Sequence, residues 1–341
     1  MTHENGRDRV LSAIQGDTSA RLAFMPITMM FASDNAGVTY HAYATDHRVL
    51  VESQLRFSED YDADHVSAIS DPGREAADCG AAIQYFENQP PAVDENHARL
   101  SEKKELIGLQ IPDPLGGGRM HDRVRAIERF HDRVQGDKLI EGWVEGPCAE
   151  AADLRGINTL MMDFYEDETF VRDLMAFCVE MGLQFGRAQL EAGADLIGVG
   201  DAAASLIGPD LYDSFVLPEE KRLVQGLQAM GGRVRLHICG NTTPILRGMG
   251  ELGCEIVDLD YPASLAEARR CMPTGQVLLG NIDPVRVLKD GTPQSIYDAI
   301  AECHRQTGPG YIVGAGCEVP RGTRPENVRA MHQYAREHFN L

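Results

Sequence analysis

The 341-residue sequence lacks any apolar stretch that approaches the roughly 18 consecutive residues of a membrane-spanning helix. Its first residues, MTHENGRDRVL, also lack the apolar segment of a secretory signal. Eight cysteines are ordinary usage for a chain of this length, and they favour a reduced compartment rather than a disulfide framework. We therefore expect a cytoplasmic protein without a membrane partner.

Positive charge is scarce. Lysine and arginine total 32 against 52 aspartates and glutamates, which gives a formal net charge of −20. Such a surface repels the phosphates of nucleic acids and of anionic lipids. The composition thus excludes nucleic-acid binding from the expected functions, whereas 43% hydrophobic residues are enough for a large folded core.

No internal repeat or low-complexity tract is visible. Instead, strand-like apolar runs alternate with amphipathic patterns, as in 168–190, where Phe170, Leu174, Met181 and Phe185 recur at helical spacing. The eight runs are LAFMPIT (22–28), ADHVSAI (63–69), IEGWVEG (140–146), DLIGVG (195–200), RVRLHIC (233–239), EIVDLD (255–260), QVLLGNI (276–282) and YIVGAG (311–316). This alternation predicts an α/β fold, a (β/α)8 TIM barrel that occupies residues 1–341 as a single domain.

Two segments add to this plan. A helix over about 7–15 is expected to cover the bottom of the barrel. The stretch from about 70 to 138 is longer than one strand–helix unit requires and contains several prolines and the GGG at 116–118. We interpret it as a lid-like excursion over the barrel mouth.

Polar side chains gather where the predicted strands end, which is where a parallel barrel places its active site. The residues at these ends are Glu145, Asp201, His237, Cys239, Asp258, Asp260, Asn281, Asp283, Cys317 and Glu318. His237 and Cys239 are two residues apart, so on one strand they point to the same side.

His237, Cys239 and Cys317 form a ligand set that suits zinc. Three protein ligands leave one coordination position open, which is typical of a catalytic rather than a structural zinc. The third ligand follows 78 residues after Cys239, unlike the short paired spacings of zinc fingers. The sequence therefore predicts a catalytic metal site in a fold that exists without it.

Four segments carry a resemblance to the uroporphyrinogen decarboxylase superfamily that extends over nearly the whole chain. They are RDRVLSAIQGD (7–17), DAAASLIGPDLYDSFVLPEEKRLV (201–224), LLGNIDPVRVLKDGTPQSI (278–296) and GPGYIVGAGCEVPRGTRPENVRAM (308–331). The decarboxylases themselves carry an arginine-rich motif after the first strand, whereas residues 26–37 (PITMMFASDNAG) contain no arginine. The HICG and GAGCEVP segments instead resemble the corrinoid-dependent methyltransferases, such as methylcobamide:coenzyme M methyltransferases.

This resemblance implies that His237, Cys239 and Cys317 bind zinc and that cobalamin, on a separate corrinoid carrier protein, is the co-substrate. A thiol is a poor nucleophile when protonated, and zinc in contact with its sulfur removes the proton. We therefore expect methyl transfer between the corrinoid and a small acceptor, with a thiol such as coenzyme M as the favoured one.

Four further residues receive roles at the site. Glu145 and Asp201 are assigned to catalysis: Glu145 to occupy the open position or accept a proton, and Asp201 to contact the substrate. Met29 and Asn281 are assigned to cofactor binding, Met29 against the corrin macrocycle and Asn281 as a polar contact. A purely structural role is the alternative for each of the four.

Other functions stay open at this point. The methyl group could pass in the opposite direction, in a corrinoid-dependent demethylase, or the acceptor could be tetrahydrofolate. Uroporphyrinogen decarboxylation is disfavoured by the missing arginines. A zinc-bearing subunit without turnover would be a different class of protein, and the open coordination position disfavours it.

Overall fold

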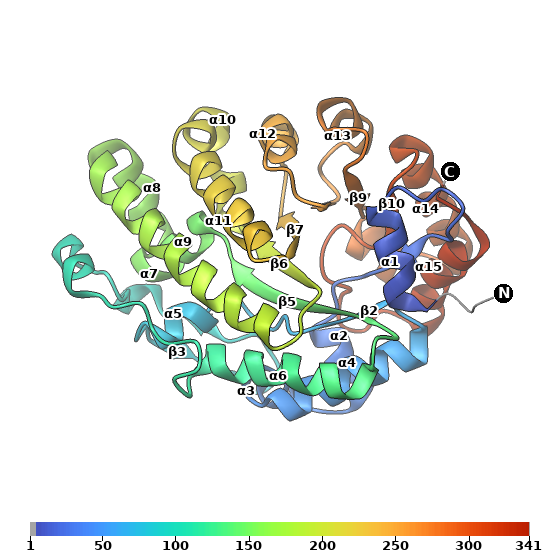
Figure 1. Cartoon of the computed structure of the whole chain (residues 1–341), viewed down its shortest axis with the longest axis horizontal. Helices are drawn as coiled ribbons and strands as arrows, with labels where there is room; N and C mark the ends of the chain where they lie inside the picture. The colour runs from blue at the N-terminus through green and yellow to red at the C-terminus, as the bar shows by residue number, and fades with distance from the viewer. Residues whose placement is uncertain (1–4, 341) are drawn as a thin grey trace.

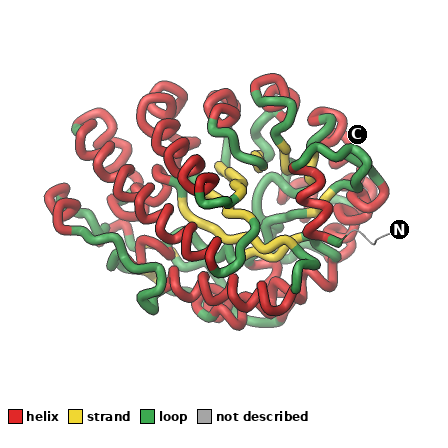
Figure 2. Tube along the Cα trace, viewed as in Figure 1, coloured by secondary structure: helices red, strands yellow, loops and turns green. Residues whose placement is uncertain are grey.

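The computed structural model describes residues 5–340, in which eight parallel strands form a nearly closed barrel inside a ring of helices (Figures 1 and 2). The sheet order is β1-β10-β9-β8-β7-β6-β5-β2. These strands are β1 (Ala23–Phe24), β2 (His65–Ser67), β5 (Leu139–Glu145), β6 (Leu196–Gly200), β7 (Arg233–Ile238), β8 (Ile256–Leu259), β9 (Val277–Leu279) and β10 (Tyr311–Val313). Seven of them lie within the predicted apolar runs and β5 begins one residue before its run, so the predicted barrel is confirmed.

The barrel closes between β1 and β2 through Asp64, which bonds to β1 with both its backbone N–H and its carboxylate. The Asp64 N–H donates to the Phe24 carbonyl at 3.0 Å, and the Phe24 N–H donates to Asp64 Oδ2 at 2.8 Å. Arg9 from the first helix donates to Asp64 Oδ1 at 2.6 Å. The seam thus relies on a buried carboxylate because the two flanking strands are only two and three residues long.

The first helix, α1 (Gly6–Ile14), covers the bottom of the barrel as expected. Its Val10 and Ala13 pack with residues at the beginnings of strands, including Leu139 and Leu196. Asn5 begins the helix by accepting a hydrogen bond from the Asp8 N–H. The amino ends of the strands are therefore sealed, and the opposite rim is left for a site.

The remaining helices connect the strands and pack around them (Figure 1). They are α2 (Met30–Ala36), α3 (Tyr40–Thr45), α4 (His47–Tyr61), α5 (Arg74–Asp78), α6 (Arg119–Val134), α7 (Pro147–Arg155), α8 (Ile157–Glu166), α9 (Glu168–Glu191), α10 (Gly208–Leu211), α11 (Leu217–Ala229), α12 (Leu246–Glu251), α13 (Leu265–Cys271), α14 (Pro293–Thr307) and α15 (Pro325–Glu337). Short 3-10 turns are η1 (Glu95–His97), η2 (Lys103–Gly108), η3 (Ala202–Leu206) and η5 (Thr243–Ile245), and π-helical turns are η4 (Tyr212–Val216) and η6 (Pro284–Lys289). None of the helices in this part of the chain has the length and apolar character that crossing a bilayer requires.

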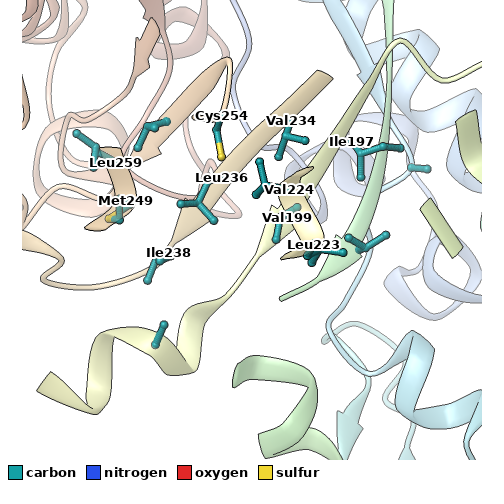
Figure 3. Packing of buried hydrophobic residues seen from close by; sticks show 14 of the residues in the cluster. Ile197, Val199, Leu223, Val224, Val234, Leu236, Ile238, Met249, Cys254 and Leu259 are labelled. Atoms are coloured by element: carbon teal, nitrogen blue, oxygen red, sulfur yellow. The ribbon is translucent and has the colours of Figure 1, made fainter. Parts of the chain in front are cut away.

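Alternation along the strands separates the core from the site. Leu236 and Val234 of β7 pack outward with Leu223 and Val224 of α11 (Figure 3). The alternate residues of the same strand, Arg235 and His237, point into the barrel. One strand thus contributes to the hydrophobic layer with one face and to a polar interior with the other.

The excursion is shorter than predicted. Residues 70–118 contain α5, the two turns η1 and η2 and a small antiparallel pair, β3 (Ile83–Gln84) with β4 (Ala92–Val93). The following helix α6 is an ordinary barrel helix that packs beside α4 and β5. Extending the excursion to residue 138 was therefore wrong, because the apolar face of α6 (Val124, Ile127, Phe130) belongs to the core.

Candidate metal centre

His237, Cys239 and Cys317 come together at the carboxyl rim of the barrel. His237 Nε2 lies 3.2 Å from Cys239 Sγ, which lies 3.7 Å from Cys317 Sγ. One ligand atom from each of the three residues falls within 4.8 Å of the others. Tetrahedral zinc with Zn–S bonds of about 2.3 Å separates two sulfurs by roughly 3.8 Å, so the spacing fits this metal.

Tight turns bring the two thiols to this point. Gly240 follows Cys239 with φ of 91°, and its N–H donates to Asp260 Oδ2 at 2.6 Å. Gly316, which precedes Cys317, packs so closely that a Cβ there would lie 2.4 Å from the Tyr261 nitrogen. Glycine is required at 240 by the left-handed backbone and at 316 by the close approach.

The charges around the three ligands favour a cation. Burial lowers the pKa of His237, but Cys239 and the Asp258 carboxylate outweigh this effect and raise it well above its usual range. The hydrogen bond from Cys239 lowers the pKa of Cys317 to about 4, against the opposing effect of burial. A proton or a metal ion is therefore stabilised at this position, and a set of two thiolates and one imidazole suits zinc.

A cavity of about 190 Å³ opens beside the ligands. Its wall contains all three of them, together with Ile27, Met29, Ile69, Ser70, Asp71, Pro72, Arg74, Pro90, Trp143, Glu145, Gly200, Ala202 and Glu318. Residues 70–74 and 90 belong to the excursion, which thus forms one side of the cavity. Glycines on β6 make room at the base, because a Cβ at Gly198 would lie 2.1 Å from the Trp143 ring.

Glu145, assigned to catalysis from its place at a strand end, does line this cavity. Its Oε1 accepts a hydrogen bond from Arg74 Nη2 at 2.8 Å, and its N–H donates to Glu75 Oε1 at 2.9 Å. Burial raises the pKa of Glu145 well above its usual range although Arg74 opposes the shift. A buried carboxyl with this raised pKa is suited to proton exchange inside the cavity.

Asp201, the other residue assigned to catalysis, is fully buried and is not among the residues that line the cavity. Its two carboxylate oxygens accept from the N–H groups of Cys148 at 3.2 Å and Ala149 at 2.6 Å, in the first turn of α7. Burial raises its pKa to about 7. In the structure the Asp201 carboxylate orients the turn that follows β5, and β5 is the strand that ends at Glu145.

The two residues assigned to cofactor binding differ in their positions. Met29 lines the cavity and is partly buried, so it is available to an apolar ligand. Asn281 is absent from the cavity wall; its Nδ2 donates to the carbonyls of Asp260 at 3.0 Å and Ala263 at 2.8 Å. Asn281 thereby fixes the loop after β8 in this structure.

Two residues that contribute to the site were not identified from the sequence: Arg74 reaches Glu145 from the excursion, and Trp143 forms part of the cavity wall. Glu318, noted at a strand end but given no role, accepts from the N–H groups of Met29 at 3.2 Å and Met30 at 2.6 Å. Trp143 carried the one usable signal, since it is the only tryptophan and lies two residues before Glu145 on the same face of a strand.

Comparisons with known proteins place the chain in a family. The sequence profile of the family described as uroporphyrinogen decarboxylase (URO-D) matches residues 5–338. The methylcobamide:CoM methyltransferase MtbA of Methanosarcina mazei is 26% identical over 262 residues, covering 76% of this chain and 75% of its own. A uroporphyrinogen decarboxylase of Nostoc sp. is 23% identical over 297 residues, covering 85% and 83% of the two chains.

A solved structure has the same fold. It is titled a methyltransferase from Methanosarcina mazei, and it superimposes with a TM-score of 0.88 at 23% identity over 98% of each chain. The profile match extends over nearly the whole chain. The chain therefore belongs to the uroporphyrinogen decarboxylase family.

Proposed function

We propose that the protein is a zinc-dependent methyltransferase that moves a methyl group between a corrinoid, presented as methylcobamide by a carrier protein, and a small thiol such as coenzyme M. The observation that carries this proposal is the convergence of His237, Cys239 and Cys317 at the wall of a small cavity. The relatives named methylcobamide:CoM methyltransferases support the choice of reaction.

Zinc, when bound, would keep the sulfur of the thiol deprotonated and able to attack the methyl group on cobalt. The methyl group would leave cobalt without the electron pair of the cobalt–carbon bond, so cobalt would change from Co(III) to Co(I). The new carbon–sulfur bond would form in the same step. His237, Cys239 and Cys317 would hold the metal. Glu145 is placed to exchange a proton with the thiol, and the apolar part of the cavity wall excludes water.

The size of the cavity separates the possible acceptors. Its volume of about 190 Å³ is below the roughly 300 Å³ at which pockets for drug-sized ligands begin. A small thiol fits this space, whereas tetrahydrofolate is several times larger. The corrinoid is larger still, so its methyl group must be presented at the mouth of the cavity, and the partly buried Met29 in the cavity wall offers it an apolar contact.

The proposed location is the cytoplasm. All eight cysteines are free thiols in the structure. Cys239 and Cys317 can bind a metal only in the reduced form, which a reducing compartment maintains.

Thiol binding provides the direct test. We expect the zinc X-ray absorption spectrum to gain one sulfur neighbour on addition of coenzyme M, and calorimetry in buffers of different ionisation enthalpy to show release of about one proton per thiol at neutral pH. The alcohol of equal length, lacking sulfur, is the control ligand. An unchanged sulfur count with every thiol, together with rapid methylation of tetrahydrofolate, would replace this proposal with the folate-dependent reaction.

A second prediction separates the two named activities of the family. We expect no coproporphyrinogen from uroporphyrinogen, because residues 26–37 contain no arginine or lysine to bind the substrate carboxylates. Among the described residues 5–340, Arg74 is the one arginine or lysine in the cavity wall. It is already paired with Glu145 and Glu75. Porphyrin fluorescence after oxidation measures the product, and loss of methyl from methylcobalamin in the same preparation shows that the protein is active. Product formation at ordinary turnover would contradict the proposed reaction.

A further inference from the structure

A line of charged side chains crosses the barrel interior and ends at the metal ligands. Its members are Glu141, Arg235, Asp258 and His237, whose exposed fractions are 1%, 0%, 0% and 4%. Burying this many charges lowers the stability of the fold unless each charge is paired. Stability alone therefore does not account for their presence in the barrel interior.

The contacts are continuous and alternate in sign. Glu141 Oε1 accepts from Arg235 Nη1 at 3.0 Å. Asp258 Oδ2 accepts from Arg235 Nε at 3.1 Å and Nη2 at 2.7 Å. The same Oδ2 lies 3.1 Å from His237 Nδ1, while His237 Nε2 is directed to Cys239. The ligand histidine is thus linked through one carboxylate to a clamped guanidinium.

Strand geometry makes this line possible. Arg235 and His237 are two residues apart on β7 and share a face, and His237 lies in register with Asp258 on β8. Between Arg235 and Glu141 stands β6, which places Gly198 opposite Arg235. A Cβ at Gly198 would lie 2.1 Å from the Trp143 ring, so glycine leaves this space to the indole, and the Arg235 guanidinium lies 6.0 Å from the ring centroid on its way to β5.

We propose that Asp258 and Arg235 are positioning residues that set the tautomer and orientation of His237 for metal binding. A neutral imidazole carries one N–H, and the Asp258 oxygen 3.1 Å from Nδ1 is the acceptor for that proton, although the contact in this structure is not aligned as a hydrogen bond. Nε2 is then left with its lone pair directed to the metal. The proposal rests on the proposed function only through the metal that His237, Cys239 and Cys317 would bind.

Arg235 has a distinct part in this arrangement. Its two N–H groups on Asp258 Oδ2 prevent the carboxylate from rotating away from His237, and Glu141 balances the positive charge. Lysine could keep the charge but could not make the forked contact, since its ammonium is a single point donor. Metal affinity should therefore depend on the shape of the Arg235 side chain as well as on its charge.

The test is the zinc dissociation constant, measured on the full chain by competition with a chromophoric chelator. We expect Asp258→Asn to raise it by about 10–100-fold, the usual effect of losing a carboxylate behind a histidine ligand. Arg235→Met should raise it in the same direction, and Arg235→Lys should recover part of the loss. The cobalt-substituted proteins should show altered visible bands in the same order, a readout that does not depend on catalysis.

The matched control is Asp163→Asn. Asp163 is also buried and accepts from a buried arginine, Arg155 Nε, at 2.7 Å, but it lies on α8 away from the site. This variant should lose stability without losing zinc affinity. If Asp258→Asn does not fold, Arg235→Lys decides the question, because it keeps the buried charge.

Two results would overturn the inference, and they have different meanings. Zinc dissociation constants of Asp258→Asn and Arg235→Met within about twofold of the wild-type value would refute the positioning role alone. A wild-type protein that binds no zinc would refute both this role and the proposed function.

Discussion

Replacing Cys317 by alanine should remove stoichiometric zinc and reduce methyl transfer from methylcobalamin to thiol by at least about a thousandfold, because the metal supplies several kcal/mol of charge stabilisation to the reaction. Cys317 lies only 3.7 Å from Cys239, so the two thiols must share one ion. Elemental analysis of the purified variant and the rate of cob(I)alamin formation measure the two effects.

The variant should remain folded, because the barrel core is built from apolar residues away from these thiols. Its circular dichroism spectrum should match that of the wild type. Cys271→Ala is the control, since Cys271 is exposed and lies on α13. Full zinc occupancy in the Cys317 variant would show that the three residues do not form the metal centre.

Replacing Arg74 by methionine should lower the free energy of unfolding by about 3–5 kcal/mol at neutral pH, the usual cost of removing one partner from a buried ion pair. Arg74 is almost completely buried and contacts Glu145 at 2.8 Å and Glu75 at 3.4 Å. It also donates to the Asp71 carbonyl. Without it, two buried carboxylates lose the cation that they share.

The loss should depend on pH in a defined direction. Burial raises the pKa of both Glu145 and Glu75 above the unfolded value, so the folded state binds more protons. Removing Arg74 raises these pKa values further. The difference from the wild type should therefore be smallest and constant at a pH of about 4.3, where these carboxyls are protonated in both folded proteins, and grow once the pH passes the raised pKa values of the folded wild type.

Urea unfolding of both proteins across this pH range measures the difference. Arg222→Met is the matched control, because Arg222 bonds Glu180 and Glu219 at the surface, where an ion pair contributes about 0–1 kcal/mol. A loss below about 1 kcal/mol for the Arg74 variant, or a loss that shrinks with rising pH, would show that the Arg74 pairs contribute little.

The barrel could be predicted from the sequence because its parallel strands are buried and largely apolar, so that each forms a recognisable run between helical patterns. Their ends were less predictable. The first run was expected over 22–28, yet the ladder of β1 covers only Ala23–Phe24. Apolar residues continue beyond the last ladder hydrogen bond because Ile27 packs beside the cavity with Ile69 and Trp143.

The clustering of His237, Cys239 and Cys317 could be predicted because histidine and cysteine at strand ends are distinctive. Carboxylates and amides at the same ends are not, since they also cap turns. The Asp201 carboxylate accepts hydrogen bonds in the first turn of α7, and the Asn281 amide donates to carbonyls after β8. A strand-end position fixes the rim on which a residue lies but not the direction of its side chain, so direct substrate contact by Asp201 and Asn281 remains a prediction.

Contacts between distant segments were beyond reach for a different reason. Arg74 meets Glu145 across 71 residues, and Arg235 meets Glu141 across 94. Neither separation has a periodic signature, and one sequence contains no record of which charges pair. The residues that support the metal ligands therefore emerged only from the three-dimensional structure.

Cys239 and Cys317 lie 78 residues apart on either side of β8 and β9. An ion held between them would be a removable cross-link that encloses the three strands β8, β9 and β10 in one loop, and binding that favours the folded chain adds to its stability by mass action. Losing the ion would leave this part of the barrel easier to open and to cleave. Zinc supply in the cell would then govern the lifetime of the protein as well as its turnover.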